Sequence, residues 1–181
     1  IHALSQLNEI AEINPAALKL ARNFWPGPLT LVLPKKPIVP DAVSAGLPSV
    51  AVRMPSHPLL RQLLKLTGVP IAAPSANLFG YVSPTSAEHA RAGLGKKIRY
   101  ILDGGPCDIG LESTIVDLRN PKKPRLLRPG AVTLAELSRA LGVRVRPAPA
   151  KAGLGAQLAP GLLARHYSPH TPVMLHARIS P

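Results

Sequence analysis

Small polar residues follow an apolar run near the middle of the chain. Residues 69–73 are apolar and strand-like, and Ser75, Ala76 and Asn77 come shortly after them. A loop of small residues lets backbone N–H and hydroxyl groups approach a phosphate or another oxygen-rich ligand closely. Taken alone, a Ser-Ala-Asn sequence fits an ordinary strand-to-turn junction better than a ligand site.

A second, glycine-rich stretch, 103–117, ends in Glu112, Ser113 and Thr114 and then enters an apolar run. Side chains at the mouth of a strand often contact ligands in α/β folds. The spacing fits this reading and a hairpin turn with Glu112 in solvent equally well. No histidine is spaced to activate Cys107, so we interpret that thiol as a small apolar side chain rather than a nucleophile.

Arginines stand at the ends of two further strand-like runs. Arg53 ends the run 49–53, and Arg128 follows the run 125–127. A guanidinium binds a carboxylate or phosphate through two parallel hydrogen bonds, so two of them at one edge of a sheet would hold an acidic substrate. Another basic and aromatic group, around Tyr167, follows a flexible stretch and could close over a ligand as a lid.

The composition narrows the class of protein. The chain has 181 residues, a net charge of +13 and one cysteine, which excludes a disulfide framework and a Cys-rich zinc site. The six histidines show no metal-ligand spacing, so we expect no metal on protein ligands. No apolar run approaches the roughly 20 residues of a membrane span, and we expect a cytoplasmic protein without membrane contact. The charge favours an anionic partner.

Local signals predict alternating helices and strands. Two helices are expected over 5–25, separated where Asn14 can cap and Pro15 can begin the second. Another helix begins at Pro58 and ends at Gly68. Two capping boxes, Thr85 with Glu88 and Thr133 with Glu136, predict helices that end near Gly93 and at Gly142. Strands are expected at 29–33, 49–53, 69–73, 98–102, 114–118, 125–127 and 143–145.

This order of elements predicts an α/β fold with a twisted mixed sheet, partly parallel and partly antiparallel, and flanking helices. After Arg146 the composition shifts to Ala, Pro and Gly. We therefore expect one globular domain over 1–146, a linker over 147–171, and the start of a further domain over 172–181.

The order and wording of several motifs resemble the YrdC-like family of threonylcarbamoyl-AMP synthases, in its long, linker-bearing class. These motifs are Phe24-Trp25-Pro26-Gly27-Pro28-Leu29-Thr30, Val52-Arg53-Met54-Pro55, Ala73-Pro74-Ser75-Ala76-Asn77 with Ser83-Pro84-Thr85, Glu112-Ser113-Thr114-Ile115-Val116-Asp117 and Leu127-Arg128-Pro129-Gly130. The resemblance spans residue 1 to about 142, and Arg165-His166-Tyr167-Ser168-Pro169 resembles the linker of the long members.

The resemblance implies a YrdC-like fold and a nucleotidyltransferase, L-threonylcarbamoyladenylate synthase. Such an enzyme joins L-threonine, bicarbonate and ATP for the t6A modification of tRNA at position 37, Mg²⁺ accompanies the ATP, and downstream t6A transferase machinery uses the product. By motif position, the threonine site would contain Ser49, Arg53, Ala73 and Ser113, and the ATP site would contain Ser75, Asn77, Ser83, Arg128 and Tyr167. No side chain is assigned as a catalytic acid or base, because positioning and charge neutralisation would supply most of the catalysis.

Two segments of the family pattern are not found in this sequence. Family members begin with a Pro-Thr-Glu-Thr-like segment and a Lys-x-Arg-Pro-like segment that bind threonine and ATP phosphates. We therefore expect that the chain is truncated at both ends and that, as it stands, it is a poor catalyst.

Two other functions compete with the synthase. A basic module that binds tRNA or double-stranded RNA without catalysis would fit the net charge of +13. The related carbamoyl-transfer domain of hydrogenase maturation resembles a much longer chain with Cys-rich zinc modules, which one cysteine does not supply.

Overall fold

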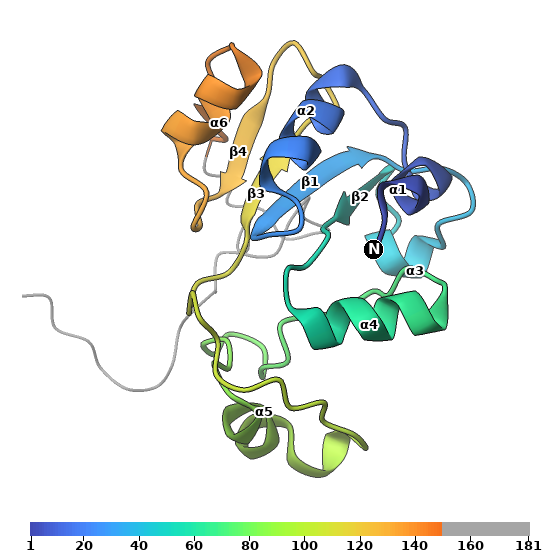
Figure 1. Cartoon of the computed structure of the whole chain (residues 1–181), viewed down its shortest axis with the longest axis vertical. Coiled ribbons are helices and arrows are strands. Elements are labelled where there is room, and N and C mark those ends of the chain that lie inside the picture. Colours follow the sequence, from blue (N-terminus) through green and yellow to red (C-terminus); the bar gives the residue numbers. More distant parts are fainter. Residues whose placement is uncertain (150–181) are drawn as a thin grey trace, which may run out of the picture.

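The structure, a computed structural model, describes residues 1–149, which form a five-stranded sheet with helices packed beside it (Figure 1). The strands are β1 (Leu29–Pro34), β2 (Ser49–Val52), β3 (Thr114–Asp117), β4 (Arg125–Arg128) and β5 (Arg146–Pro147). The helices are α1 (Leu4–Ile10), α2 (Pro15–Phe24), α3 (Asp41–Ser44), α4 (Pro58–Thr67), α5 (Ala87–Leu94), α6 (Leu134–Leu141) and the 3₁₀-helix η1 (Gly95–Lys97).

The sheet is mixed, as the sequence predicts. Its strand order is β2-β1-β3-β4-β5, where β1 runs antiparallel to β2 and parallel to β3, and β3 runs antiparallel to β4. The first residues of β1 and β3 therefore share one edge with the last residues of β2 and β4. We call this edge, where Ser113 precedes β3, the Ser113 edge, and the opposite one the Asp117 edge.

One face of the sheet holds the main core. Figure 1 shows α1, α2 and α6 on this face. Side chains alternate along a strand, so Leu29, Leu31 and Leu33 of β1 all point toward these helices and are fully buried. Burying each such leucine stabilises the fold by about 1.5 to 3 kcal/mol. A smaller cluster on the other face contains Val32 and Ile115.

Local capping chemistry explains where several helices begin and end. The Asn14 side chain accepts a hydrogen bond from the Ala17 amide and caps α2, which Pro15 opens. Gly68 ends α4 in the left-handed conformation, with φ 68°, which glycine adopts without steric cost. These ends agree with the sequence-based prediction.

The second capping box is also present. The Thr133 hydroxyl accepts from the Glu136 amide, the Glu136 side chain accepts from the Thr133 amide, and Gly142 ends α6. The predicted box of Thr85 with Glu88 is wrong, because Ser86 is the residue that caps α5 and accepts from the His89 amide. Thr85 instead contacts the His89 ring through its hydroxyl.

Three predicted strands differ from the structure. Residues 69–73 and 98–102 form no strand, because no strand among the described residues lies beside them to pair with their backbone. Pro70 removes one amide donor as well. The predicted strand 143–145 is displaced to β5, where the Arg146 amide bonds to the Pro124 carbonyl.

The segment 69–111 extends away from the sheet and carries α5 (Figure 1). It has no buried residue, and several of its large apolar side chains are exposed. Within residues 1–149, few hydrogen bonds join this segment to the sheet and its helices; one joins the His57 ring to the Gly104 carbonyl.

Most of the C-terminal predictions concern residues beyond those that the structure describes. The linker expected over 147–171, the further domain over 172–181 and Tyr167 lie beyond residue 149, apart from the first three linker residues. Of those, Pro147 is in β5 and the Ala148 amide bonds to the Leu126 carbonyl. Within residues 1–149, no helix combines the length and apolarity that crossing a membrane requires.

The α6 capping box predicts a pH-dependent contribution to stability. Hydrogen bonds from the Thr133 hydroxyl and amide lower the pKa of Glu136 below its ordinary value of 4.5. These hydrogen bonds therefore contribute fully to stability above the ordinary pKa of 4.5, where Glu136 is ionised in the folded and the unfolded chain. Their contribution is lost as the pH falls through the lowered pKa of Glu136 in the folded state. Thr133→Ala should lower the free energy of unfolding by about 1 kcal/mol in urea titrations at neutral pH.

Glu136→Gln should also destabilise the chain at neutral pH, and the difference from wild type should vanish in acid. Glu88→Gln is the matched control, because Glu88 lies in the first turn of α5 without a capping role. An equal pH-dependent difference in both variants would contradict the capping argument.

Candidate functional site

The turn before β1 brings Thr30 to the Ser113 edge. In this turn the Gly27 amide donates to the Met54 carbonyl, and the Trp25 indole N–H donates to the Leu29 carbonyl. A Cβ at Gly27 would lie 2.3 Å from the Phe24 carbonyl oxygen, so only glycine fits there. The motif around residues 24–30 therefore has a structural role beside the site.

Buried hydroxyls from two neighbouring parallel strands meet at this edge. Thr30 Oγ1 and Ser113 Oγ are 2.7 Å apart, and both residues are buried. Arg128, at the end of β4, donates from Nε to the Ser113 carbonyl at 3.0 Å and from Nη2 to Ser113 Oγ at 3.1 Å. The arginine thereby fixes the backbone and the hydroxyl of Ser113 together.

Glu112 connects this cluster to the extended segment 69–111. Its carboxylate forms an ion pair with Arg128 and accepts a hydrogen bond from Ser83 Oγ at 2.5 Å. Both side chains of the ion pair are only 14% exposed. The interpretation of Glu112 as a solvent-exposed turn residue is thus incorrect, and the loop after Tyr81 is bonded to the sheet through this carboxylate.

Arg53 lies beside the same cluster. The antiparallel register of β1 with β2, continued by one residue, sets Arg53 opposite Thr30. Desolvation, and after it the positive charge of Arg128, lowers the pKa of Arg53, although part of the residue remains exposed. An arginine nevertheless stays charged at neutral pH. No carboxylate among residues 1–149 forms an ion pair with it, so its guanidinium can receive an anionic ligand.

Ser75 and Asn77 form a separate turn. Ser75 Oγ donates to Asn77 Oδ1 at 2.5 Å, and Asn77 Nδ2 donates to the Leu78 and Tyr81 carbonyls. Ala76 has φ 57°, a left-handed conformation that this compact turn requires. Because Ser83 follows Tyr81 by two residues, the turn and the Ser83–Glu112 bond belong to one continuous loop.

The remaining predicted site residues lie elsewhere. Ser49 begins β2, so it lies at the Asp117 edge, four residues from Arg53, and is buried there. The structure does not bring Ser49 together with the other threonine-site residues. Ala73 is exposed in the extended segment and Tyr167 lies outside the described residues.

Thr30 and Glu112 are site residues that the sequence analysis did not assign. Both lie within motifs quoted for the family resemblance, and that position is the signal that could have identified them. Within residues 1–149 no group of three or more His, Cys, Asp or Glu side chains could hold a metal ion.

Gly130 allows the close packing behind this site. A Cβ at this position would lie 2.5 Å from both the Glu112 carbonyl oxygen and the Thr114 nitrogen. The Thr114 hydroxyl also bonds to the Val132 backbone, so the segments cannot separate without breaking buried hydrogen bonds.

We therefore expect Gly130→Ala to lower the free energy of unfolding by about 1 to 3 kcal/mol, measured by urea titration. Gly93→Ala is the control, because a Cβ on this glycine of α5 meets no atom within 4 Å. That change should stabilise the chain by about 0.5 to 1 kcal/mol. Small effects of the same sign in both variants would show that residue 130 tolerates a side chain.

Comparisons with known proteins identify the family of this chain. A profile of the Sua5, YciO and YrdC proteins, described as "Telomere recombination", matches residues 1–130. The chain is 46% identical over 177 residues to a Threonylcarbamoyl-AMP synthase of Pyrococcus abyssi, covering 97% of this chain and 52% of the relative. A Bacillus subtilis protein of the same name is 43% identical over 95% of this chain and 50% of its own.

Solved structures of the same family superpose on this chain. Pyrococcus abyssi Sua5 complexed with L-threonine superposes with a TM-score of 0.87 at 47% identity, over 92% of this chain and 49% of that one. Escherichia coli YciO superposes with a TM-score of 0.67 at 26% identity, over 75% of this chain and 66% of its own. This chain thus spans about half the length of the first relatives it matches. On the family profile, the sequence identities and the shared mixed sheet, the chain belongs to the Sua5/YciO/YrdC family.

Proposed function

We propose that residues 1–146 carry the substrate-binding part of an L-threonylcarbamoyladenylate synthase, a nucleotidyltransferase that supplies threonylcarbamoyl-AMP for the t6A modification of tRNA. One observation carries the proposal: Arg53, which forms no ion pair with a carboxylate within residues 1–149, lies opposite Thr30 and the hydroxyl cluster at the Ser113 edge. The relatives named Threonylcarbamoyl-AMP synthase and the threonine-bound Sua5 structure support it.

Arg53 would bind the carboxylate of L-threonine through two parallel hydrogen bonds. The Thr30 and Ser113 hydroxyls can donate and accept, so they suit the polar groups beside that carboxylate. Arg128 is already bonded to Ser113 and paired with Glu112, which makes it a fixed positive charge rather than a mobile arm.

The threonine amine attacks the carbon of bicarbonate, and loss of water leaves a carbamate. A carbamate oxygen then attacks the α-phosphorus of ATP, forming an O–P bond while the bond to the pyrophosphate oxygen breaks. The products are threonylcarbamoyl-AMP and pyrophosphate. Holding the reactants together and neutralising the phosphate charge would supply most of the rate enhancement.

We further propose that the nucleotide lies against the loop that contains Ser75, Asn77 and Ser83, near Arg128. Mg²⁺ would neutralise ATP phosphates and is usually held through one or two carboxylates plus the phosphates themselves.

The first test is calorimetric titration of the chain with L-threonine. We expect binding, and Arg53→Ala should weaken it about 10- to 100-fold, because a charged hydrogen-bonded contact contributes about 1.5 to 3 kcal/mol. Arg53→Lys should give an intermediate affinity, since it keeps the charge but loses the two parallel hydrogen bonds.

Arg61→Ala on the exposed side of α4 is the matched control and should leave the affinity unchanged. L-threonine amide, which lacks the carboxylate, should bind wild type weakly and should bind Arg53→Ala with a similar affinity. The proposal fails if wild type does not bind L-threonine, or if Arg53→Ala discriminates against the amide as wild type does. RNA binding with no response to threonine would favour the RNA-binding module instead.

A second test concerns Glu112, which holds Ser83 and Arg128 at once. Glu112→Ala should release both proposed ATP contacts and weaken Mg-ATP binding about tenfold more than L-threonine binding. Glu112→Gln keeps an acceptor for Ser83 and should restore part of the ATP affinity. Equal weakening for both ligands would indicate a general disruption of the fold and would contradict this positioning role.

A further inference from the structure

Two side chains form hydrogen bonds with the Ser113 hydroxyl. Arg128 Nη2 donates to Ser113 Oγ at 3.1 Å, and Thr30 Oγ1 lies 2.7 Å from the same oxygen. A serine hydroxyl offers one proton and two acceptor lone pairs, whereas a guanidinium can only donate. Arg128 therefore fills one lone pair of Ser113 Oγ, and the contact with Thr30 uses either the second lone pair or the proton.

The direction of the hydrogen bond between Thr30 and Ser113 decides what Ser113 can offer a ligand. If Ser113 donates, the Thr30 proton has no acceptor among residues 1–149. If Thr30 donates, both lone pairs of Ser113 Oγ are filled and the Ser113 proton remains for an oxygen outside the chain. Both residues are buried, and a buried donor without a partner is costly. An acceptor bound beside Ser113 would therefore satisfy the proton that this pair leaves over.

Charge favours Ser113 over Thr30 as the hydroxyl that donates to a ligand. A hydroxyl that accepts a hydrogen bond from a charged group becomes a stronger donor, because successive hydrogen bonds polarise one another. Ser113 accepts such a bond from Arg128, whereas Ser113 is the only hydrogen-bond partner of the Thr30 side chain within residues 1–149. Arg128 also donates from Nε to the Ser113 carbonyl at 3.0 Å, which fixes the position of the hydroxyl.

The neighbouring arginine indicates which group of L-threonine would face Ser113. Arg53 lies opposite Thr30 when the register of β1 with β2 is continued by one residue, and no carboxylate within residues 1–149 pairs with it. A guanidinium and a donating hydroxyl both suit a carboxylate, and neither can accept from an ammonium group. The amine of L-threonine would thus face away from Arg53 and Ser113 and stay open to reaction.

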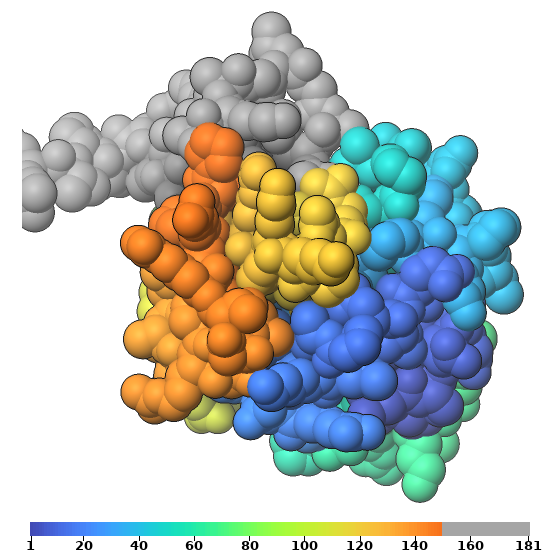
Figure 2. All heavy atoms as spheres, turned by 90° about the horizontal axis from the view of Figure 1, so that it is seen from above, coloured from blue at the N-terminus to red at the C-terminus, as the bar shows by residue number. Residues whose placement is uncertain are grey.

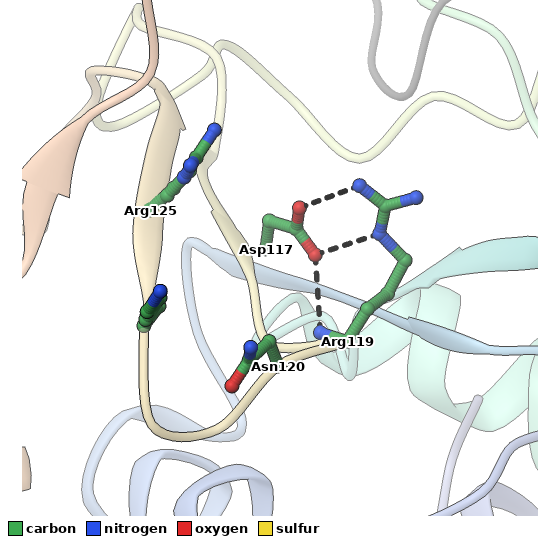
Figure 3. Close-up of a pocket in the computed structure, with 5 residues that line it drawn as sticks. Asp117, Arg119, Asn120 and Arg125 are labelled. Carbon is green, nitrogen blue, oxygen red and sulfur yellow. Dashed lines mark hydrogen bonds and ion pairs between the residues drawn. The ribbon is translucent and has the colours of Figure 1, made fainter.

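The opposite end of β3 provides a contrast. Figure 2 shows the β3–β4 turn, in yellow, at the surface of the molecule there. Arg119 donates to the Asp117 carboxylate from its backbone amide, Nε and Nη2 at 2.8 to 3.0 Å (Figure 3). That guanidinium already has an acceptor within the chain. Arg53 forms no such pair within residues 1–149, so at the Ser113 edge the acceptor can come from a ligand.

We propose that Thr30 is a positioning residue for L-threonine. It donates its hydroxyl proton to Ser113 Oγ and thereby makes the Ser113 hydroxyl a donor to the carboxylate of the ligand. Thr30 acts through Ser113 and not through a ligand contact of its own. The inference rests on the proposed binding of L-threonine at the Ser113 edge, and it adds which group of the ligand faces Ser113 and why.

The test is a double-mutant cycle in which calorimetry measures the L-threonine affinity of the full chain. Thr30→Val keeps the shape of the side chain but removes its hydroxyl, so it should weaken binding about 3- to 10-fold, the effect of one neutral hydrogen bond. Ser113→Ala should weaken binding by at least as much. In the Ser113→Ala background, Thr30→Val should have no further effect, because the hydroxyl through which Thr30 acts is gone.

Two further variants separate this role from a structural one. Thr30→Ser restores a hydroxyl and should restore most of the affinity that Thr30→Val loses. Ser138→Ala is the matched control, because it removes a hydroxyl of α6 that donates to the Leu134 carbonyl and accepts from the Val145 amide. This change should lower the free energy of unfolding in urea and leave the L-threonine affinity unchanged.

Three results would overturn the inference while the proposed function stands, because wild type binds L-threonine in each. They are an unchanged affinity in Thr30→Val, a failure of Thr30→Ser to restore binding, and further weakening by Thr30→Val in the Ser113→Ala background. The last would indicate that Thr30 contacts the ligand directly. A wild-type chain that does not bind L-threonine would overturn the proposed function and this inference together. Should circular dichroism show that Thr30→Val does not fold, Thr30→Ala replaces it in the same cycle, with the same expected results.

Discussion

The contact between Arg128 and the residues before β3 is the one on which the candidate site depends. Its guanidinium bonds to the Ser113 carbonyl and hydroxyl and pairs with Glu112. Glu112 in turn accepts from Ser83, so one network joins two strands and the loop outside the sheet. Removing one partner from a poorly exposed ion pair leaves an uncompensated charge, which commonly costs about 3 to 5 kcal/mol. The network is therefore cooperative, because each side chain supplies a hydrogen-bond or ion-pair partner that another member needs.

This network links two parts of the described chain that are stabilised by different interactions. The sheet and the helices α1, α2 and α6 share a continuous apolar core. The segment 69–111 has no buried side chain. Within the part of the chain that the structure describes, it makes a few polar contacts, such as Ser83 with Glu112 and, inside the segment, the Cys107 amide with the Thr85 carbonyl. Regions with few buried apolar contacts open at low free-energy cost. The loop proposed to bind the nucleotide thus lies in the less stable segment 69–111. Arg53 and Ser113, which are proposed to bind L-threonine, lie at the ends of strands of the sheet.

The sequence predicted several features that local chemistry determines, although it placed the cap of α5 at Thr85 instead of Ser86. Asn14, Gly68 and the Thr133–Glu136 box end or begin helices through contacts within a few residues, and the mixed sheet followed from the order of elements. The strands expected at 69–73 and 98–102 were wrong because a strand needs a distant backbone partner, which an apolar run does not reveal. The candidate site also depends on partners that are distant in the sequence. Thr30 and Glu112 were not assigned, because their contacts are with residues 83 and 16 positions away. Ser49 was grouped with Arg53, and the length of β2 places these two residues at opposite edges of the sheet.

The two edges of the sheet are farther apart than the screening length of physiological salt. Ser113 and Asp117 are four residues apart along an extended chain, about 13 Å, whereas the screening length at physiological salt is about 8 Å. Charges at one edge therefore act only weakly on ligands at the other under those conditions. Arg53, Lys123 and Arg125 are all exposed, although desolvation of the Arg53 guanidinium lowers its pKa. The two edges are thus separate electrostatic environments: at one, Arg128 is paired with Glu112 and Arg53 has no carboxylate partner within residues 1–149, and at the other, Arg119 is paired with Asp117.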